Sequence, residues 1–280
     1  IAIITSISPD HLDIYDDIND LFLAFHQFAS QVKNDGLLLV ESSIDYVFPT
    51  PVNGLKLTYS AKSKHATIFA EHIQKKKNKY YFDIKSKINK NIIKNKSLVG
   101  INMPGIHNIS NALSASVVAS YLGLSELEIH DAFSTFKGIN RRFQKHIDSE
   151  KLVYIDDYAH HPNEVKATIA TVKDIYPFRK LTVIFQPHLY TRTRDLAQDF
   201  ADSFAHVDEL ILLDIYAARE KPIEGVTSEM LLKLCKNSNK SLCNKKNLLS
   251  VLKQSNLDIL LTLGAGDIGV FAKPIKKILN

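Results

Sequence analysis

The second half of the sequence alternates apolar, strand-like runs with helical segments, and this alternation constrains the fold more than any other feature. The strand-like runs are Leu152–Ile155, Leu181–Phe185, Glu209–Leu213 and Asp258–Leu263. Segments with helical spacing follow Pro162, Thr191, Thr227 and Lys246. Strands separated by helices are joined by crossovers, which place the strands parallel and the helices on both faces of the sheet. The pattern therefore predicts a doubly wound α/β domain.

The first half is expected to be an α/β unit with a β elaboration. Short alternating segments between Pro49 and Tyr81 are consistent with antiparallel strands. Ser125 and Glu128 have the spacing of a capping box and predict a helix start. The remaining pattern predicts a buried strand at Ile1–Ile4, a helix over 21–32, a strand at Leu37–Val40 and an alanine-rich helix at Asn108–Leu122.

The length of 280 residues suits two domains. The strand–helix alternation begins only after Arg141-Arg142-Phe143, so we place the boundary between Phe143 and Lys151. This predicts domains at residues 1–146 and 147–280.

Composition excludes several classes of protein. A hydrophobic share of 45% and a charged share of 23% exclude wholesale disorder. The net charge of +5 comes from the stretch Lys75–Lys96, which contains nine lysines and a single acidic residue, Asp83. The rest of the chain has a net charge of −3, which argues against a general nucleic-acid binder. That stretch suits either a solvated loop or a surface for phosphates or acidic partners. No run of about 18 apolar residues occurs, so membrane insertion is not expected. Two cysteines and no secretory leader favour a cytoplasmic location.

Asp10-His11-Leu12-Asp13 follows the first predicted strand. Loops at strand carboxyl ends are where α/β sheets hold ligands. Two carboxylates and an imidazole there could ligate Mg²⁺ or cap the following helix, and the spacing leaves both open.

Asn108 and Asn111 lie one helical turn apart at the start of the alanine-rich helix, so their amides share a face. An amide offers both a donor and an acceptor, which is what a purine edge requires. An N-cap asparagine beside an ordinary surface asparagine explains the same pattern.

Polar and aromatic side chains follow two strands of the second half. In the segment from Asp156 to Pro162, aspartates could accept hydrogen bonds from ribose and histidines could exchange protons. The alternative is capping by Asp157 beside exposed histidines. In the segment from Phe185 to Asp195, Arg192 and Arg194 suit a carboxylate or phosphate, or form a solvated helix start.

Taken together and in this order, the motifs resemble those of the Mur ligase family of bacterial peptidoglycan synthesis. They are D-H-L-D, G-x-H-N-x-x-N-A-L, F-K-G-x-x-R-R-F, D-D-Y-A-H-H-P, F-Q-P-H-x-Y-x-R-T-R-D-L, L-L-D-I-Y and G-A-G-D-I-G, and they cover essentially the whole chain. The first two are shared widely, whereas D-D-Y-A-H-H-P with F-Q-P-H-x-Y-x-R-T-R is similar to the alanine-adding members. Leu189 stands where that pattern has arginine.

The resemblance implies the later part of a central ATP-binding domain, followed by a Rossmann-like C-terminal domain. The UDP-binding domain and the phosphate-binding loop G-T-x-G-K-[ST] are expected in a missing N-terminal region before Ile1, so the isolated chain is expected to be inactive.

The resemblance also implies an ATP-dependent acid–amino-acid ligase that joins L-alanine to UDP-N-acetylmuramate through an acyl phosphate, with ATP and Mg²⁺ as cofactors. It implies roles for particular residues: His11 as a Mg²⁺ ligand; Asn108 and Asn111 at adenine; Arg142 and Asp157 at the nucleotide; Tyr158, His160, His188 and Arg192 at the alanine and acyl-phosphate side, the last three as catalytic residues.

Two other interpretations stay open. The chain could be a non-catalytic, adenine-nucleotide-binding remnant, or it could belong to the ligase that recycles murein tripeptide. That ligase resembles the D-H and H-H-P segments but not Gln186-Pro187-His188 with Arg192-Thr193-Arg194.

Overall fold

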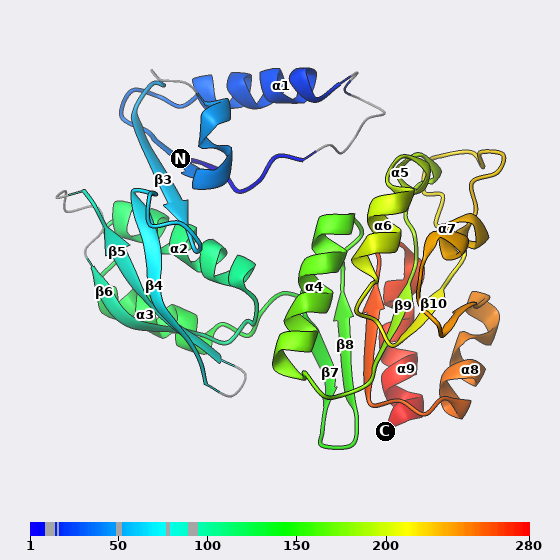
Figure 1. Ribbon diagram of the computed structural model, residues 1–280. Coiled ribbons are helices and arrows are strands. Elements are labelled where there is room, and N and C mark those ends of the chain that lie inside the picture. The colour runs from blue at the N-terminus through cyan, green and yellow to red at the C-terminus, as the bar shows by residue number, and fades with distance from the viewer. Residues whose placement is uncertain (9–14, 16, 49–51, 77–78, 89–94) are drawn as a thin grey trace. The chain divides into compact units, whose positions relative to one another are not determined.

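The computed structural model describes residues 1–8, 15, 17–48, 52–76, 79–88 and 95–280 (Figure 1). The chain forms two compact units, Ile1–Lys137 and Gly138–Asn280, which are described separately. The boundary predicted at 146/147 lies within the strand β7 (Gln144–Asp148), which belongs to the second unit and pairs there with β8 (Val153–Asp157). Among the described residues, no helix combines the length and the apolar character that a membrane-spanning segment needs.

The first unit is built on a mixed sheet with the strand order β1-β2-β3-β4-β5-β6 among the described residues. Neighbours from β1 to β4 are parallel, and those from β4 to β6 are antiparallel. The strands are β1 (Ala2–Ile4), β2 (Leu37–Glu41), β3 (Leu55–Ser60), β4 (Ile68–Lys76), β5 (Lys79–Ser86) and β6 (Lys96–Ile101). The antiparallel elaboration predicted from the sequence is therefore confirmed for β4 and β5 and extends to β6.

The prediction was wrong for β3, which pairs in parallel with both of its neighbours. For its pairing with β2, the physical reason is the connection between the two strands. The short 3₁₀ helix η1 (Ser42–Val47) lies between β2 and β3, so the chain crosses back before entering β3 instead of turning through a tight hairpin.

Helices cover both faces of this sheet at β2. Leu37 and Leu39 belong to the core cluster of helix α2 (Ile106–Tyr121), whereas Leu38 and Val40 belong to that of helix α1 (Ile18–Ser30). Successive side chains of a strand point to opposite faces, so one apolar run serves two cores.

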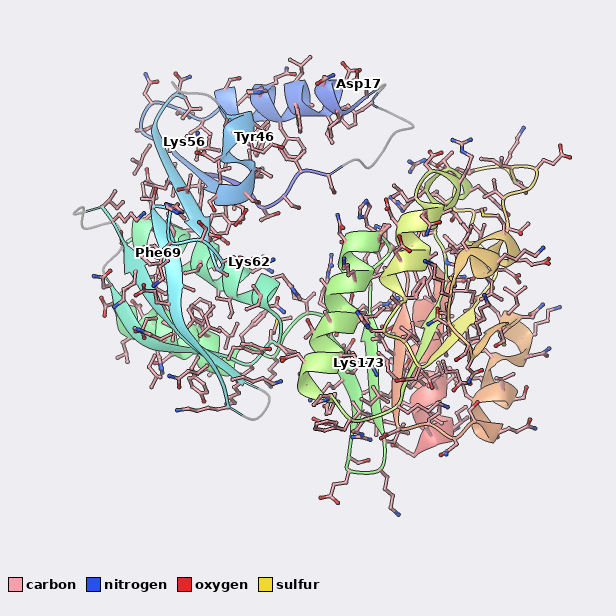
Figure 2. The ribbon with its side chains drawn as sticks, in the orientation of Figure 1. Asp17, Tyr46, Lys56, Lys62, Phe69 and Lys173 are labelled. Atoms are coloured by element: carbon pink, nitrogen blue, oxygen red, sulfur yellow. The ribbon has the colours of Figure 1, made fainter. Side chains whose placement is uncertain are left out.

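Two helices of the first unit, α1 and α3 (Glu126–Thr135), begin at a side-chain cap. Asp17 caps α1, with its carboxylate accepting from the amides of Asn19 at 2.7 Å and Asp20 at 3.0 Å, and these bonds lower the pKa of Asp17 (Figure 2). The capping box predicted at Ser125 and Glu128 is confirmed at the start of α3.

The second unit is a doubly wound sheet with the order β11-β10-β9-β12-β8-β7. All neighbours are parallel except β7, an antiparallel edge strand. The strands predicted from the sequence are confirmed as β8 (Val153–Asp157), β9 (Leu181–Phe185), β10 (Glu209–Leu212) and β12 (Ile259–Leu263). The edge strands β7 and β11 (Lys240–Leu242) were not predicted.

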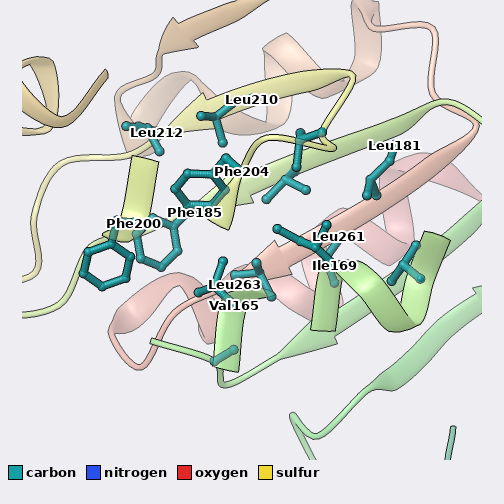
Figure 3. Close-up of a cluster of buried hydrophobic side chains, with 14 of the residues drawn as sticks. Val165, Ile169, Leu181, Phe185, Phe200, Phe204, Leu210, Leu212, Leu261 and Leu263 are labelled. Carbon is teal, nitrogen blue, oxygen red and sulfur yellow. The ribbon is translucent and has the colours of Figure 1, made fainter. Parts of the chain in front are cut away.

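Each face of this sheet has its own core. Phe185, Phe200 and Phe204 pack on the face that also receives Val165 and Ile169 (Figure 3). The helices of this side are α4 (Pro162–Ile175), α6 (Ala197–Ser203) and α7 (Ser228–Leu234), and the short helix α5 (Tyr190–Asp195) precedes α6.

The opposite face is covered by α8 (Leu248–Gln254), η3 (Asp267–Phe271) and α9 (Ala272–Leu279). Their side chains Leu252, Ile268 and Ile275 pack against Tyr154 and Ile184. Helices cover both faces of the sheet, so the loops that follow the strands remain accessible at the strand ends. The candidate site lies at the carboxyl ends of the parallel strands.

Candidate active site

The loops after β8, β9, β10 and β12 leave the same edge of the second sheet, because these four strands are parallel neighbours. In open α/β sheets this carboxyl edge is the usual place for ligands. Two segments that the sequence analysis singled out, from Asp156 to Pro162 and from Phe185 to Asp195, begin at the ends of β8 and β9.

A chain of rings crosses this edge. The rings of Tyr158 and His160 lie 5.2 Å apart, those of His160 and His188 5.8 Å apart, and those of His188 and Tyr216 5.6 Å apart with nearly parallel planes. Three of these four residues were predicted as site residues, and the structure brings them together from two loops. Tyr216, from the loop after β10, was missed.

Arg192 completes the cluster from helix α5. Its side chain is buried, and its Nη1 lies 3.1 Å from Nδ1 of His188. A guanidinium can only donate hydrogen bonds, so Nδ1 of His188 accepts, and the neutral ring carries its proton on Nε2. His188 is therefore held as a hydrogen-bond donor at this edge.

His160 is held in the opposite tautomer. Its Nδ1 lies 2.9 Å from the carbonyl oxygen of Tyr158 and 3.4 Å from Oε2 of Glu164. Both neighbours are acceptors, so Nδ1 carries the proton and the lone pair of the neutral ring is on Nε2. The two histidines thus differ in what their Nε2 atoms offer.

Burial is the main cause that lowers the pKa of His188 to about 4, and electrostatic interactions with Arg192 and with the His160 imidazole add to it. Glu220 acts in the other direction and Arg219 in the same one. At neutral pH the imidazole is uncharged, which fits its role as acceptor from Arg192.

This lowered pKa predicts a pH dependence of folding stability. Between about pH 6.5 and pH 4 the unfolded chain binds a proton at His188 and the folded chain does not, so stability is lost as the pH falls through that window. We expect His188→Asn, which keeps a neutral acceptor, to show a shallower fall of the unfolding free energy over this range. Denaturant unfolding at a series of pH values measures it. The exposed His206→Asn is the control and should follow the parent; equal slopes for His188→Asn and the parent would contradict the prediction.

Asp157 shapes the loop after β8. Its Oδ2 accepts from the amide of Phe143 at 2.7 Å and its Oδ1 from the amide of Ala159 at 2.8 Å, and burial raises its pKa. The alternative in which Asp157 caps the next helix is wrong. His161 is the N-cap of α4, and Pro162 occupies the first turn as expected.

Arg142 lies beside the cluster. The centre of its guanidinium is 5.7 Å from the centroid of the Tyr158 ring, and its Nη1 is 3.9 Å from Oε1 of Glu164. It remains about half exposed. The structure therefore places Arg142 next to a predicted site residue, with room for a further contact.

Arg141 and Asp156 form a buried connection that the sequence pattern did not predict. Nε of Arg141 lies 3.0 Å from Oδ2 of the fully buried Asp156, and its Nη2 donates to the carbonyl of Gly264 at 2.6 Å. The hydroxyl of Thr262 donates to the other carboxylate oxygen at 2.7 Å. This network ties the start of the unit to the glycine turn after β12. The doubled motifs R-R-F and D-D-Y were the available signal.

The glycine turn is also held by Gln186 at the end of β9. Its amide donates to Asp267 at 2.7 Å and accepts from the backbone of Ile268 at 2.9 Å. Gly264 has φ +139°, and a Cβ there would lie 2.7 Å from the carbonyl oxygen of Gln186. Only glycine permits this close approach.

Leu189, which replaces the arginine of the family pattern, is buried at φ +71°. Its amide donates to the carbonyl of Tyr216 at 3.0 Å. In this chain the position is filled by an apolar, packed side chain.

The first unit holds the other predicted pair. The side chain of Asn111 donates to Oδ1 of Asn108 at 3.4 Å, which confirms that the two amides share a face. Asn108 in turn donates to the carbonyl of Pro104 at 2.6 Å. The N-cap interpretation of Asn108 is wrong, because Gly105 occupies that position.

His11 lies outside the described residues, as do Asp10 and Asp13. Among the residues that are described, no group of three His, Cys, Asp or Glu side chains could hold a metal ion. The prediction of His11 as a Mg²⁺ ligand stays a prediction.

Two family models match this chain: the Mur ligase middle domain over residues 1–119, and the Mur ligase glutamate ligase domain over residues 141–266. The chain belongs to the Mur ligase family. Within that family it is similar to the UDP-N-acetylmuramate–L-alanine ligases of Christiangramia forsetii, at 42% identity over 279 residues, and of Porphyromonas gingivalis, at 40% over 281 residues. These alignments cover 100% of this chain and 59% and 60% of those proteins.

Solved structures show the same fold. The UDP-N-acetylmuramate–alanine ligase of Thermotoga maritima matches with a TM-score of 0.74 at 24% identity, over 98% of this chain and 58% of that one. The MurF ligase of the same organism, solved in complex with ADP, matches with a TM-score of 0.66 at 11% identity, over 96% and 58%. The chain therefore spans about three-fifths of the length of these relatives.

Proposed function

We propose that this chain is part of an ATP-dependent ligase that joins L-alanine to UDP-N-acetylmuramate. The similarity to alanine-adding ligases supports the substrates. The observation that carries the proposal is the convergence of Tyr158, His160, His188 and Arg192 at the carboxyl edge of the second sheet. Two buried thiols, Cys235 and Cys243, that form no disulfide are in keeping with a cytoplasmic location.

The reaction has two steps. An oxygen of the muramoyl carboxylate bonds to the γ-phosphorus of ATP, and ADP leaves. The amine of alanine then bonds to the acyl carbon, and phosphate leaves. Positioning of the reactants and stabilisation of the charge on oxygen dominate such chemistry.

The two tautomers suit the second step. The donor Nε2–H of His188 and the guanidinium of Arg192 are matched to oxygens of a carboxylate or an acyl phosphate. The lone pair on Nε2 of His160 is matched to the proton that the alanine ammonium must lose before attack. Tyr158 lies edge-on to the His160 ring and fixes its plane.

The nucleotide would be read mainly in the first unit. The paired amides of Asn108 and Asn111 offer donors and acceptors that suit an adenine edge. Arg142 and Asp157 stay proposed nucleotide contacts, Arg142 through its half-exposed guanidinium. Both oxygens of Asp157 already accept backbone bonds, so a ribose contact would use their second lone pairs. Mg²⁺ would neutralise phosphate charge, with His11 as its proposed ligand.

Asn111 gives the cleaner test of adenine recognition, because Asn108 also bonds the backbone of Pro104. In the full-length ligase, Asn111→Ala should raise the KM for ATP about ten- to a hundredfold while sparing GTP, since an unpaired base edge costs roughly 1–3 kcal/mol. Steady-state kinetics with each nucleotide measures this. Asn140→Ala serves as an exposed control. Equal losses for ATP and GTP would show that Asn111 only supports the helix start.

A coupled ADP-release assay on the full-length protein tests the proposal as a whole. ADP should appear only when UDP-N-acetylmuramate and L-alanine are both present. Activity with a tripeptide instead would support the recycling ligase. ATP binding without turnover on any acceptor would support the nucleotide-binding remnant.

A further inference from the structure

His188 and Arg192 lie on the segment after β9, and residues of the loop after β10 hold this segment in place. Tyr216 donates its amide proton to the carbonyl of Pro187 at 2.8 Å and accepts from the amide of Leu189 at 3.0 Å. These two bonds enclose His188 and bring the Tyr216 ring against its imidazole.

Glu220, on the same loop, caps helix α5. Its Oε2 accepts from the amides of Tyr190 at 2.5 Å and Thr191 at 3.1 Å, and its Oε1 accepts from the hydroxyl of Thr191 at 2.5 Å. The helix has no cap of its own, because the residue before it is the aliphatic Leu189. A carboxylate from a distant loop therefore satisfies the first amides of α5.

We propose that Glu220 is a positioning residue for the His188–Arg192 pair, acting through the first turn of α5. The inference rests on the proposed function for the role of that pair. His188 precedes α5 and its N-cap residue Leu189, whereas Arg192 lies in the first turn of the helix, so the contact between Nδ1 and Nη1 depends on that turn being wound. A six-residue helix has little stability of its own, so its first turn depends on external hydrogen bonds.

Loss of the Glu220 cap should affect the use of alanine and not the use of ATP. Loss of the cap lets the turn fray, which separates Arg192 from His188 and releases the imidazole to exchange its tautomers. The fold should persist, because the core on this face of the sheet is formed by side chains such as Phe185, Phe200 and Phe204, none of which belongs to α5. Errors of about 1 Å in the placement of a catalytic group cost on the order of a hundredfold in rate.

The test uses four variants of the full-length ligase: Glu220→Ala, Glu220→Gln, Thr191→Val and Glu224→Gln. Glu220→Ala removes all three bonds and should raise the KM for alanine at least about tenfold, leaving that for ATP within about twofold. Glu220→Gln retains an acceptor oxygen and should fall between this variant and the parent. Thr191→Val loses one bond and should have the smallest effect. Glu224→Gln, exposed on the same loop, is the control and should match the parent.

A second measurement does not depend on turnover. The ¹⁵N shifts of the His188 ring in this 280-residue chain report its tautomer. They should show the Nε2–H form in the parent and a mixture in Glu220→Ala. If Glu220→Ala does not fold, Glu220→Gln carries the same test.

An alanine KM within twofold of the parent together with an unchanged ring spectrum would overturn the proposal, and so would equal increases in the KM for ATP and alanine. Failure of the parent itself to use alanine would instead count against the proposed function, while the ring spectrum still decides the role of Glu220.

Discussion

Arg192→Lys in the full-length ligase is expected to lower kcat/KM for L-alanine about a hundredfold, which is about 2.7 kcal/mol of transition-state stabilisation. Lysine keeps the positive charge, but its ammonium is a compact point charge whose donors lack the fixed planar fork of guanidinium. In the structure one arm of that fork is engaged with Nδ1 of His188. Lysine cannot hold His188 and at the same time present the two parallel N–H groups that bind a carboxylate bidentately.

Arg194→Lys is the matched control, because Arg194 lies on the same short helix, is about half exposed and pairs with the adjacent Asp195. It should stay within about twofold of the parent. Kinetics with alanine varied at saturating ATP, and then with ATP varied at saturating alanine, make the comparison. The prediction that Arg192 acts on alanine would be contradicted if Arg192→Lys kept the kinetics of the parent with alanine, or if its KM for ATP rose as much as its KM for alanine.

Of the variants compared for stability, Asp156→Ala is expected to lose the most free energy of unfolding, about 3 kcal/mol. Removing one partner of a buried ion pair typically costs about 3–5 kcal/mol because the other charge is left without compensation. Here the guanidinium of Arg141, the hydroxyl of Thr262 and the glycine turn held through Gly264 all lose their common anchor. Asp156→Asn keeps an acceptor for Thr262 and should lose less.

The control is Lys173→Ala. Lys173 pairs with Asp208 at 2.6 Å near the surface (Figure 2), and such pairs contribute less than about 1 kcal/mol. Denaturant unfolding followed by circular dichroism measures both variants, and hydrogen exchange of β8 and β12 assigns the loss to the second unit. If Asp156→Ala and Lys173→Ala prove equally stable, the buried network does not stabilise the unit.

The apolar runs of β8, β9, β10 and β12 are by themselves sufficient to predict the fold of the second unit. Strands buried on both faces have continuous apolar sequences, and the intervening helical segments leave room only for parallel crossovers. The segments that carry Tyr158, His160, His188 and Arg192 followed from the same reasoning, since they come after such strands, whereas the roles of these residues followed from the resemblance to the Mur ligase family. The capping box of Ser125 and Glu128 was equally visible, because both of its halves lie within one helical turn.

Tertiary structure alone decided the rest. The edge strands β7 and β11 carry few apolar residues, so their extended form comes from pairing with β8 and β10 rather than from a pattern of their own. Which side chain caps which helix was also not visible: Gly105 and His161 hold positions for which Asn108 and Asp157 were candidates.

The support of the site was invisible for a further reason. Glu220 and Tyr216 are far along the chain from the helix and the imidazole that they hold, and no local spacing links them. They meet because β10 lies parallel beside β9, so that the loops after both strands leave the sheet at the same edge. Local sequence therefore determined which groups could carry the chemistry, whereas the order of the strands decided which distant residues hold them in place.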